Sequence, residues 1–387
     1  MTRVFDEDAL LRASTLQVPE GDFGDDDFRP ALAALLRALE HEAQLDPRGQ
    51  WAATARIIAA LNRRRRLSDL LSREPAVTEV ELQTPIFILG FPRTGTTMLH
   101  NLLAGDRANR AIRLWEMREP FAPRNPPPTW KREVIETTSQ LVEAGYQLSP
   151  RLRQIHPLRA TWPDECSWLF RNSFASMVFG FSYFIPSYLE FLAQRDASAD
   201  YEYFRLQLQA ILFQRPGTQL VLKDPCHIWN LDALLKAFPD ARVIHLHRRL
   251  EQVVPSFCSL CQALQEGGAT ARPLPEIGAY ATDMLTHGMQ RMLEVRAELE
   301  PGRIYDLDYR RLVDDPLATV GDIYAHFGLE LDEGASSAMH SWLEQSRGLT
   351  GKHSYSLDMF GLDASALAQR FAPYDDTIMT QLEGRAR

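Results

Sequence analysis

The stretch PIFILGFPRTGTT, residues 85–97, decides the fold. Its first six residues form a short apolar run that ends in glycine, which is typical of a buried strand in a parallel sheet. Apolar residues at helical spacing resume directly afterwards, from Gly95 onward, in GTTMLHNLLAG. We therefore expect a strand, a tight loop and a helix in immediate succession.

Three further apolar runs predict strands at 219–222, 241–246 and 304–307, with a helical segment near 229–238 between the first two. Strands that alternate with helices favour an α/β fold: a central parallel sheet with helices on both faces. A mostly helical, aromatic-rich insertion over about 110–215 precedes the run at 219–222. Apolar positions at helical spacing over 30–72 predict a helical N-terminal extension. We expect this extension to occupy residues 1–80 and one domain to occupy 81–387.

The composition is that of an ordinary globular protein: 387 residues, 45% hydrophobic and 24% charged, with a formal net charge of −9. This charge argues against a general affinity for nucleic acid or acidic lipid, so an anionic ligand must be bound by local groups. Four cysteines are too few for a disulfide framework and favour a reducing, cytoplasmic location. No signal peptide or membrane span is predicted. The RRRR run at 63–66 is interpreted as the solvated end of a helix.

The loop after the first strand has the G-x4-G frame of a phosphate-binding loop, between Gly90 and Gly95. Such a loop turns backbone N–H groups inward at a helix N-terminus, where the dipole favours an anion. The lysine position of a Walker loop holds Thr96, the next residue, Thr97, keeps a hydroxyl, and the positive charge stands earlier, at Arg93. We expect this loop to hold a phosphate-like group.

A second pattern lies about 150 residues later, where the run VIHLH at 243–247 leads into Arg248 and Arg249. The carboxylate that would help to hold magnesium is missing at the end of this strand. An arginine there can instead contact a phosphate in bidentate fashion, and Ser256 can add its hydroxyl from the next helix. Both arginines are candidates for this contact. Sulfuryl transfer fits such a metal-free site, because a sulfuryl group carries less charge than a terminal phosphoryl group.

These motifs resemble those of the sulfotransferase superfamily, whose members use 3′-phosphoadenosine 5′-phosphosulfate (PAPS). The segment PRTGTT, 92–97, resembles the family's 5′-phosphosulfate loop, particularly in the bacterial and tyrosylprotein-like branches, which have Arg where cytosolic relatives have Lys. The segment VIHLHR, 243–248, with Ser256 eight residues on, resembles the pair that binds the donor's 3′-phosphate. The resemblance spans about 85–372.

The resemblance implies roles for particular residues. Tyr309 would contact the adenosine side of the donor, and Lys352 would be a late cationic clamp. The 5′-phosphosulfate would be held by Arg93, Thr94, Gly95, Thr96 and Thr97, and the 3′-phosphate by Arg248 and Ser256.

Several residues compete for the role of the base that takes the acceptor's proton. Glu116, in WEMR at 115–118, resembles the Glu-x-Arg of tyrosylprotein-like sulfotransferases, in which the Glu is the base and the Arg contacts the reacting centre. His227 is displaced from the catalytic position of cytosolic relatives and is equally interpreted as a core histidine. Glu165 and His156 are further candidates, Glu165 being better explained as a carboxylate near a helix N-terminus.

Two cations complete the predicted catalytic set of Glu116, Lys223, His227 and Arg93. Lys223 follows an apolar strand and can neutralise charge on the donor's bridging oxygen, while Arg93 lies in the loop itself. The aromatic residues of 174–191 line an apolar acceptor pocket or, by default, pack in the core.

The sequence thus predicts sulfuryl transfer from PAPS to a hydroxyl or amine of a small-molecule acceptor, with an apolar or aromatic acceptor if the pocket interpretation holds. No metal and no nucleic-acid partner are expected. The alternatives are a P-loop kinase or NTPase, which Thr96 speaks against, and a catalytically silent nucleotide-binding protein.

Overall fold

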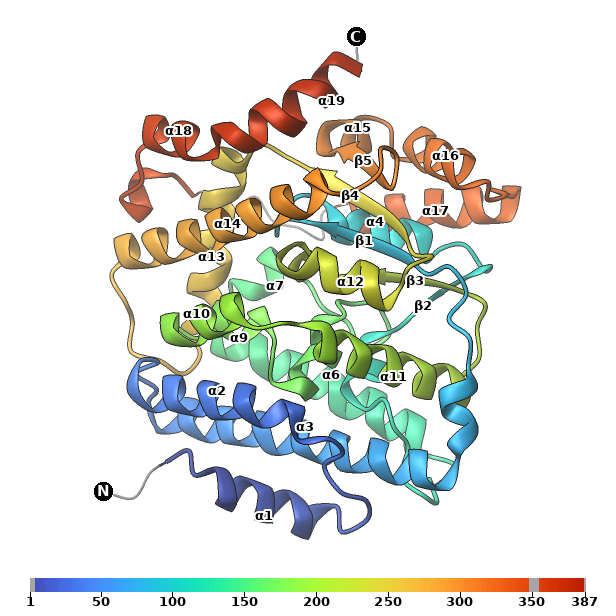
Figure 1. The fold of residues 1–387 in the computed structure, drawn as a ribbon, viewed down its shortest axis with the longest axis vertical. Helices are drawn as coiled ribbons and strands as arrows, with labels where there is room; N and C mark the ends of the chain where they lie inside the picture. The colour runs from blue at the N-terminus through green and yellow to red at the C-terminus, as the bar shows by residue number, and fades with distance from the viewer. Residues whose placement is uncertain (1–3, 348–354, 386–387) are drawn as a thin grey trace.

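A five-stranded, all-parallel sheet forms the centre of the computed structural model, which describes residues 4–347 and 355–385 (Figure 1). The strand order is β2-β3-β1-β4-β5, so β1 lies in the middle and all of its residues are buried. Each neighbouring pair is parallel. The strands are β1 (Ile86–Gly90), β2 (Asn109–Ala111), β3 (Gln219–Lys223), β4 (Arg242–His247) and β5 (Ile304–Asp308). The predicted α/β fold is confirmed.

The sequence did not predict β2. This strand has only three residues, two of them polar, and it pairs on one side only, with β3. A short edge strand carries no apolar run, because it is not covered on both faces.

Helices cover both faces of the sheet, and the side chains of β1 alternate between the two cores. Phe87 and Leu89 join the core formed with one set of helices, and Ile86 and Ile88 join the other. The first set is α11 (Ser198–Gln214), α12 (Leu231–Ala237), α13 (Leu250–Gln265) and α14 (Leu274–Ala297). The second is α4 (Thr96–Leu103), α15 (Tyr309–Asp314), α16 (Pro316–Phe327) and α17 (Glu333–Ser346).

The N-terminal helices pack against the insertion. They are α1 (Glu7–Gln17), α2 (Arg29–His41) and α3 (Pro47–Arg73), and Figure 1 shows them as a blue layer farthest from the sheet. Their apolar side chains share one cluster with Phe174, Phe179, Tyr183 and Tyr188, which belong to the aromatic stretch. These aromatic side chains are therefore core. The division of the chain at residue 80 stays a prediction.

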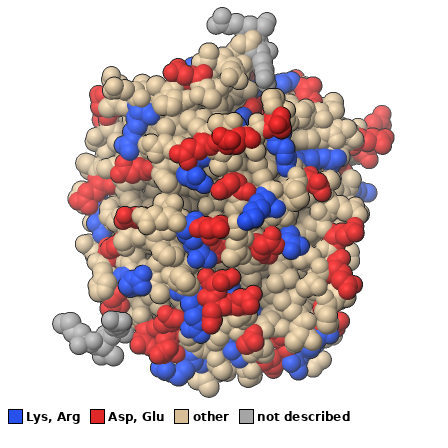
Figure 2. Space-filling view, viewed as in Figure 1, with Lys and Arg blue, Asp and Glu red and all other residues tan. Residues whose placement is uncertain are grey.

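The remaining helices lie in the insertion and at the C-terminus. They are α5 (Leu114–Arg118), α6 (Trp130–Leu148), α7 (Leu152–Ile155), α8 (Ser167–Phe170), α9 (Met177–Ser182), α10 (Pro186–Gln194), α18 (Ala364–Tyr374) and α19 (Thr380–Arg385). Among the described residues, none of the helices has the length and apolarity needed to cross a bilayer. Acidic and basic side chains are mixed on the face shown in Figure 2, without an extended basic surface there.

The arginine run at 63–66 is not the solvated helix end that the sequence suggested. Arg63, Arg64 and Arg65 are buried within α3, and their guanidinium groups donate to backbone carbonyls. Arg64 alone donates to the carbonyls of Phe23, Asp25 and Asn172. The prediction was wrong because a solvated arginine and one that binds loop carbonyls have the same sequence signature.

We predict that Arg64→Ala lowers the free energy of unfolding by about 3 kcal/mol, because it leaves buried carbonyls without a donor. Chemical denaturation measures this change. Arg66→Ala is the matched control, since Arg66 makes a partly exposed ion pair with Glu119, and its loss should lower the free energy of unfolding by less than about 1 kcal/mol. Equal effects of the two substitutions would contradict the prediction.

Candidate active site

The loop between β1 and α4 depends on two glycines with left-handed backbone. Gly90 has φ of 150° and Gly95 has φ of 92°. A Cβ atom at Gly90 would lie 2.5 Å from the carbonyl oxygen of Leu246, and one at Gly95 would lie 2.8 Å from the ring of Tyr309. Arg93 also adopts a positive φ, of 74°, which is uncommon for a residue with a side chain. The loop therefore holds a fixed, strained turn at the C-terminal edge of the sheet.

Backbone N–H groups at the start of α4 are available to a ligand. Gly95 caps this helix without a side-chain hydrogen bond, and the hydroxyl of Thr94 turns back to the carbonyl of Phe91, at 2.7 Å. Among the described residues, none accepts a hydrogen bond from the amides of Thr96 and Thr97. These amides and the helix dipole suit an anion.

The two predicted anion motifs meet at this loop, because β4 lies beside β1. The Arg93 Nε donates to the Ser256 Oγ at 3.0 Å, and the Arg93 Nη1 donates to the carbonyl of Ile155 at 2.9 Å. The Arg248 Nη1 donates to the carbonyl of Arg93 at 3.2 Å. The Arg248 guanidinium also lies 4.6 Å from the ring centre of Tyr309. Residues about 150 positions apart thus form one cationic site.

Lys223 lies at the end of β3, on the other side of β1. Its Nζ lies 2.8 Å from the Glu165 Oε1 and 3.2 Å from the Thr97 Oγ1, and the side chain is only 1% exposed. Burial alone would lower the pKa of Lys223, but the negative charges of Glu165 and Asp164 outweigh burial and raise it. Burial likewise opposes ionisation of Glu165, yet Lys223 and His156 lower the pKa of that carboxyl to about 2.

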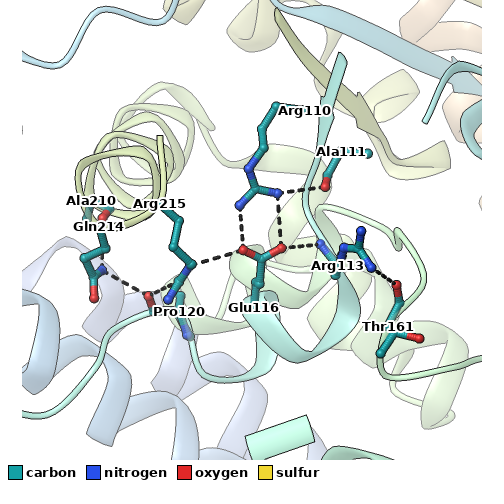
Figure 3. Close-up of polar contacts among 9 residues, drawn as sticks. All are labelled: Arg110, Ala111, Arg113, Glu116, Pro120, Thr161, Ala210, Gln214 and Arg215. Atoms are coloured by element: carbon teal, nitrogen blue, oxygen red, sulfur yellow. Dashed lines mark hydrogen bonds and ion pairs between the residues drawn. The ribbon is translucent and has the colours of Figure 1, made fainter. Parts of the chain in front are cut away.

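Glu116 lies in a different set of contacts (Figure 3). Its carboxylate accepts two hydrogen bonds from Arg110, at 2.5 and 3.1 Å, and forms an ion pair with Arg215 at 3.1 Å. It also caps α5 by accepting from the amide of Arg113 at 3.0 Å. Both carboxylate oxygens are therefore engaged, and the side chain is only 4% exposed. The role of Glu116 as the base stays a prediction, and these contacts do not favour it.

His227 is buried in an aromatic environment. Its Nδ1 lies 2.7 Å from the Tyr201 hydroxyl, and the rings of Phe87, Phe170 and Phe204 surround it. Burial lowers its pKa to about 3, so the imidazole is neutral. No hydrogen bond or ion pair joins it to the loop or to Lys223 among the described residues. These contacts favour the core interpretation.

His156, Asp164 and Glu165 form a group whose ligand-type atoms lie within 4.8 Å of one another. His245, His247 and Asp306 form another such group. In each group, a cationic side chain contacts one carboxylate. Lys223 forms an ion pair with Glu165, and Arg296 donates two hydrogen bonds to Asp306. That the site needs no metal remains a prediction.

The sequence favoured a helix-start role for Glu165 over a role as the base, because a carboxylate next to a helix start usually has a capping role. The structure places it two residues before α8, in contact with Lys223. The sequence holds no signal for this contact, because Glu165 and Lys223 lie 58 positions apart in the chain. Lys352 lies outside the described residues, so its predicted role as a clamp stays a prediction.

Comparisons with known proteins agree with the fold. Residues 85–333 match the model of the sulfotransferase family. Sulfotransferase STF1 from Mycobacterium tuberculosis H37Rv has a TM-score of 0.84 and 34% identity, covering 96% of this chain and 100% of that chain. Sulfotransferase STF9 from Mycobacterium avium has a TM-score of 0.85 and 25% identity, covering 98% of each chain.

The chain therefore belongs to the sulfotransferase family. A further relative is omega-hydroxy-beta-dihydromenaquinone-9 sulfotransferase Stf3 from Mycobacterium bovis, which is 29% identical over 253 residues. The match covers 63% of this chain and 63% of that protein, so it leaves more than a third of the relative unmatched.

We predict that Lys223→Met raises the pKa of Glu165 from about 2 to its ordinary range or above. Burial raises this pKa, and the substitution removes the positive charge of Lys223, which lowers it. Carbon-13 NMR titration of labelled glutamate carboxyls measures the shift, with Glu165→Gln to assign the signal. An unchanged pKa of Glu165 would show that Lys223 does not control this carboxylate.

Proposed function

We propose that this protein transfers a sulfuryl group from PAPS to a hydroxyl or amine of a small-molecule acceptor. The observation that carries the proposal is the convergence of Arg93, Arg248 and Ser256 at a helix start with free amides. In this proposal, the amides of Thr96 and Thr97 bind the 5′-phosphosulfate together with Arg93. Arg248 and Ser256 bind the 3′-phosphate, and the Tyr309 ring packs on the adenosine side.

In the proposed reaction, Glu165 accepts a proton and Lys223 stabilises negative charge. The acceptor oxygen or nitrogen bonds to sulfur while the bond from sulfur to the donor's phosphate oxygen breaks. Glu165 takes the acceptor's proton, and Lys223 stabilises the negative charge that develops on the leaving oxygen. Movement of the Lys223 ammonium toward that oxygen weakens its hold on Glu165, which makes the carboxylate a stronger base during the reaction.

A P-loop kinase or NTPase is the rival in another reaction class. The Walker lysine position holds Thr96, and the strand end that would carry a magnesium carboxylate holds Arg248. Binding of adenosine 3′,5′-bisphosphate followed by radiolabelled sulfate transfer to pooled small molecules tests the proposal. Magnesium-dependent ATP binding without any response to the bisphosphate would favour the rival. Bisphosphate binding without transfer would indicate a silent nucleotide-binding protein.

The four cysteines are free, and three of them are buried. This state fits the cytoplasmic location that we propose for the enzyme.

We predict that Arg248→Ala weakens bisphosphate binding by about 1.5–3 kcal/mol, or about ten- to hundredfold in Kd, through loss of a charge-assisted contact. Calorimetric titration measures it. Arg249→Ala is the matched control: Arg249 forms an ion pair with Asp375 at 3.0 Å and should change the affinity much less. A larger loss of affinity in Arg249→Ala than in Arg248→Ala would assign the 3′-phosphate contact to Arg249.

We predict that Glu165→Gln lowers kcat about a hundredfold or more while donor binding stays nearly unchanged, because the proton acceptor is lost. Steady-state kinetics and bisphosphate titration give the two readouts. Glu116→Gln should instead lower the free energy of unfolding, since Arg110 and Arg215 lose their carboxylate. Full activity of Glu165→Gln with a large loss of kcat in Glu116→Gln would restore Glu116 as the base.

A further inference from the structure

Two arginines next to the candidate active site have no anionic partner within residues 4–347 and 355–385. Arg118 ends α5 and Arg171 follows α8, and both guanidinium groups lie over the ring of Trp168, at 5.3 and 4.0 Å from its centre. Among the described residues, neither guanidinium forms a hydrogen bond or an ion pair with a side chain or carbonyl. Both are only partly exposed. Elsewhere in this protein, buried arginines such as Arg63 and Arg64 bind carbonyls.

No carboxylate in the described part of the chain forms an ion pair with either arginine of this pair. Burial, together with the neighbouring charges of Arg56 and Arg63, lowers the pKa of Arg118 to about 10 and that of Arg171 to about 9. Two nearby carboxylates form ion pairs with other side chains: Glu119 pairs with Arg66, and Glu165 pairs with Lys223. A partly buried cation without a partner is costly, so an anion brought to this place would be strongly attracted.

The pair lies beside the reacting groups. The Trp168 amide donates to the Glu165 carbonyl at 3.3 Å, and Arg171 follows Trp168 by three residues, directly after the end of α8. The Arg171 charge is also one of the causes of the low pKa of the Glu165 carboxyl. A molecule whose hydroxyl or amine reaches Glu165 would therefore have another part of itself next to Arg171.

The N-terminal helix α3 fixes the geometry of the pair. The Arg63 Nε donates to the Arg118 carbonyl at 2.5 Å, and the Arg64 Nη1 donates to the carbonyl of Asn172, the neighbour of Arg171, at 3.3 Å. One buried stretch of α3 thus holds both chain segments. Preorganised arginines lose less conformational entropy when they bind an oxyanion.

We propose that Arg118 and Arg171 bind an oxyanionic group, a carboxylate or a phosphate ester, on the acceptor molecule, with Trp168 as a flat apolar surface between them. This assignment rests on the proposed sulfuryl transfer and adds an acceptor class to it: molecules with a reactive hydroxyl or amine and, elsewhere, a negative charge. Guanidinium groups suit this chemistry, because their planar donors match two oxygens at once.

Binding to the full-length protein with its donor site filled by adenosine 3′,5′-bisphosphate tests the proposal. The probes are 4-hydroxyphenylacetate, its phosphonate analogue 4-hydroxybenzylphosphonate, and the neutral 4-hydroxyphenylacetamide, measured by calorimetry or ligand-observed NMR. At least one anion should bind about tenfold more tightly than the amide, and the better anion identifies the group. Arg118→Gln and Arg171→Gln should each remove this advantage and leave the affinity for the amide unchanged.

Arg159→Gln is the matched control, because Arg159 is an exposed arginine that lies 4.4 Å from the ring centre of Trp162. It should keep the preference for the anion. Bisphosphate affinity reports folding of each variant and tests the donor site separately. If the bisphosphate binds but the anions bind no more tightly than the amide, or all probes fail to bind, the arginine pair is not an acceptor site. An equal loss for all three probes in the variants would assign the pair a packing role.

Discussion

The site depends on the Arg93 guanidinium, which forms hydrogen bonds with two distant parts of the chain. Arg93 stands in the loop with a positive φ, which aims its side chain at Ser256 and Ile155, while its own carbonyl receives Arg248. The loop, the end of β4 and the helix after it are thereby held in one arrangement. The two glycines on either side make the turn sterically possible, since a Cβ at either position would collide with its surroundings.

Charge is distributed so that each cation around the loop has a distinct environment. Lys223 contacts a carboxylate and the Thr97 hydroxyl. Arg93 and Arg248 instead donate to carbonyl and hydroxyl oxygens, and no carboxylate of the described residues forms an ion pair with them. The proposed anionic nucleotide would therefore gain most from the two arginines, while Lys223 and Glu165 keep their contact with each other. In the function that we propose, this division separates donor binding from proton transfer.

Much of the fold could be predicted from the sequence, because the central strands are covered on both faces and consist of apolar runs. The edge strand β2 could not, since three half-buried residues carry no such signal. The loop and its two arginine-bearing motifs were predictable from glycine spacing and from order along the chain. The partners of individual charges were not: Arg64 binds carbonyls from loops more than 30 residues away in sequence, and Glu116 meets Arg215 from a different helix. Only the three-dimensional structure shows which carboxylate lies beside Lys223.

The measurement that tests the account most directly is a calorimetric titration of the protein with adenosine 3′,5′-bisphosphate in EDTA, repeated with magnesium. The account predicts tight, stoichiometric binding that is the same in both conditions, because amides and guanidinium groups hold the nucleotide without help from a divalent ion. Binding that appears only with magnesium, or no binding at all, would contradict it.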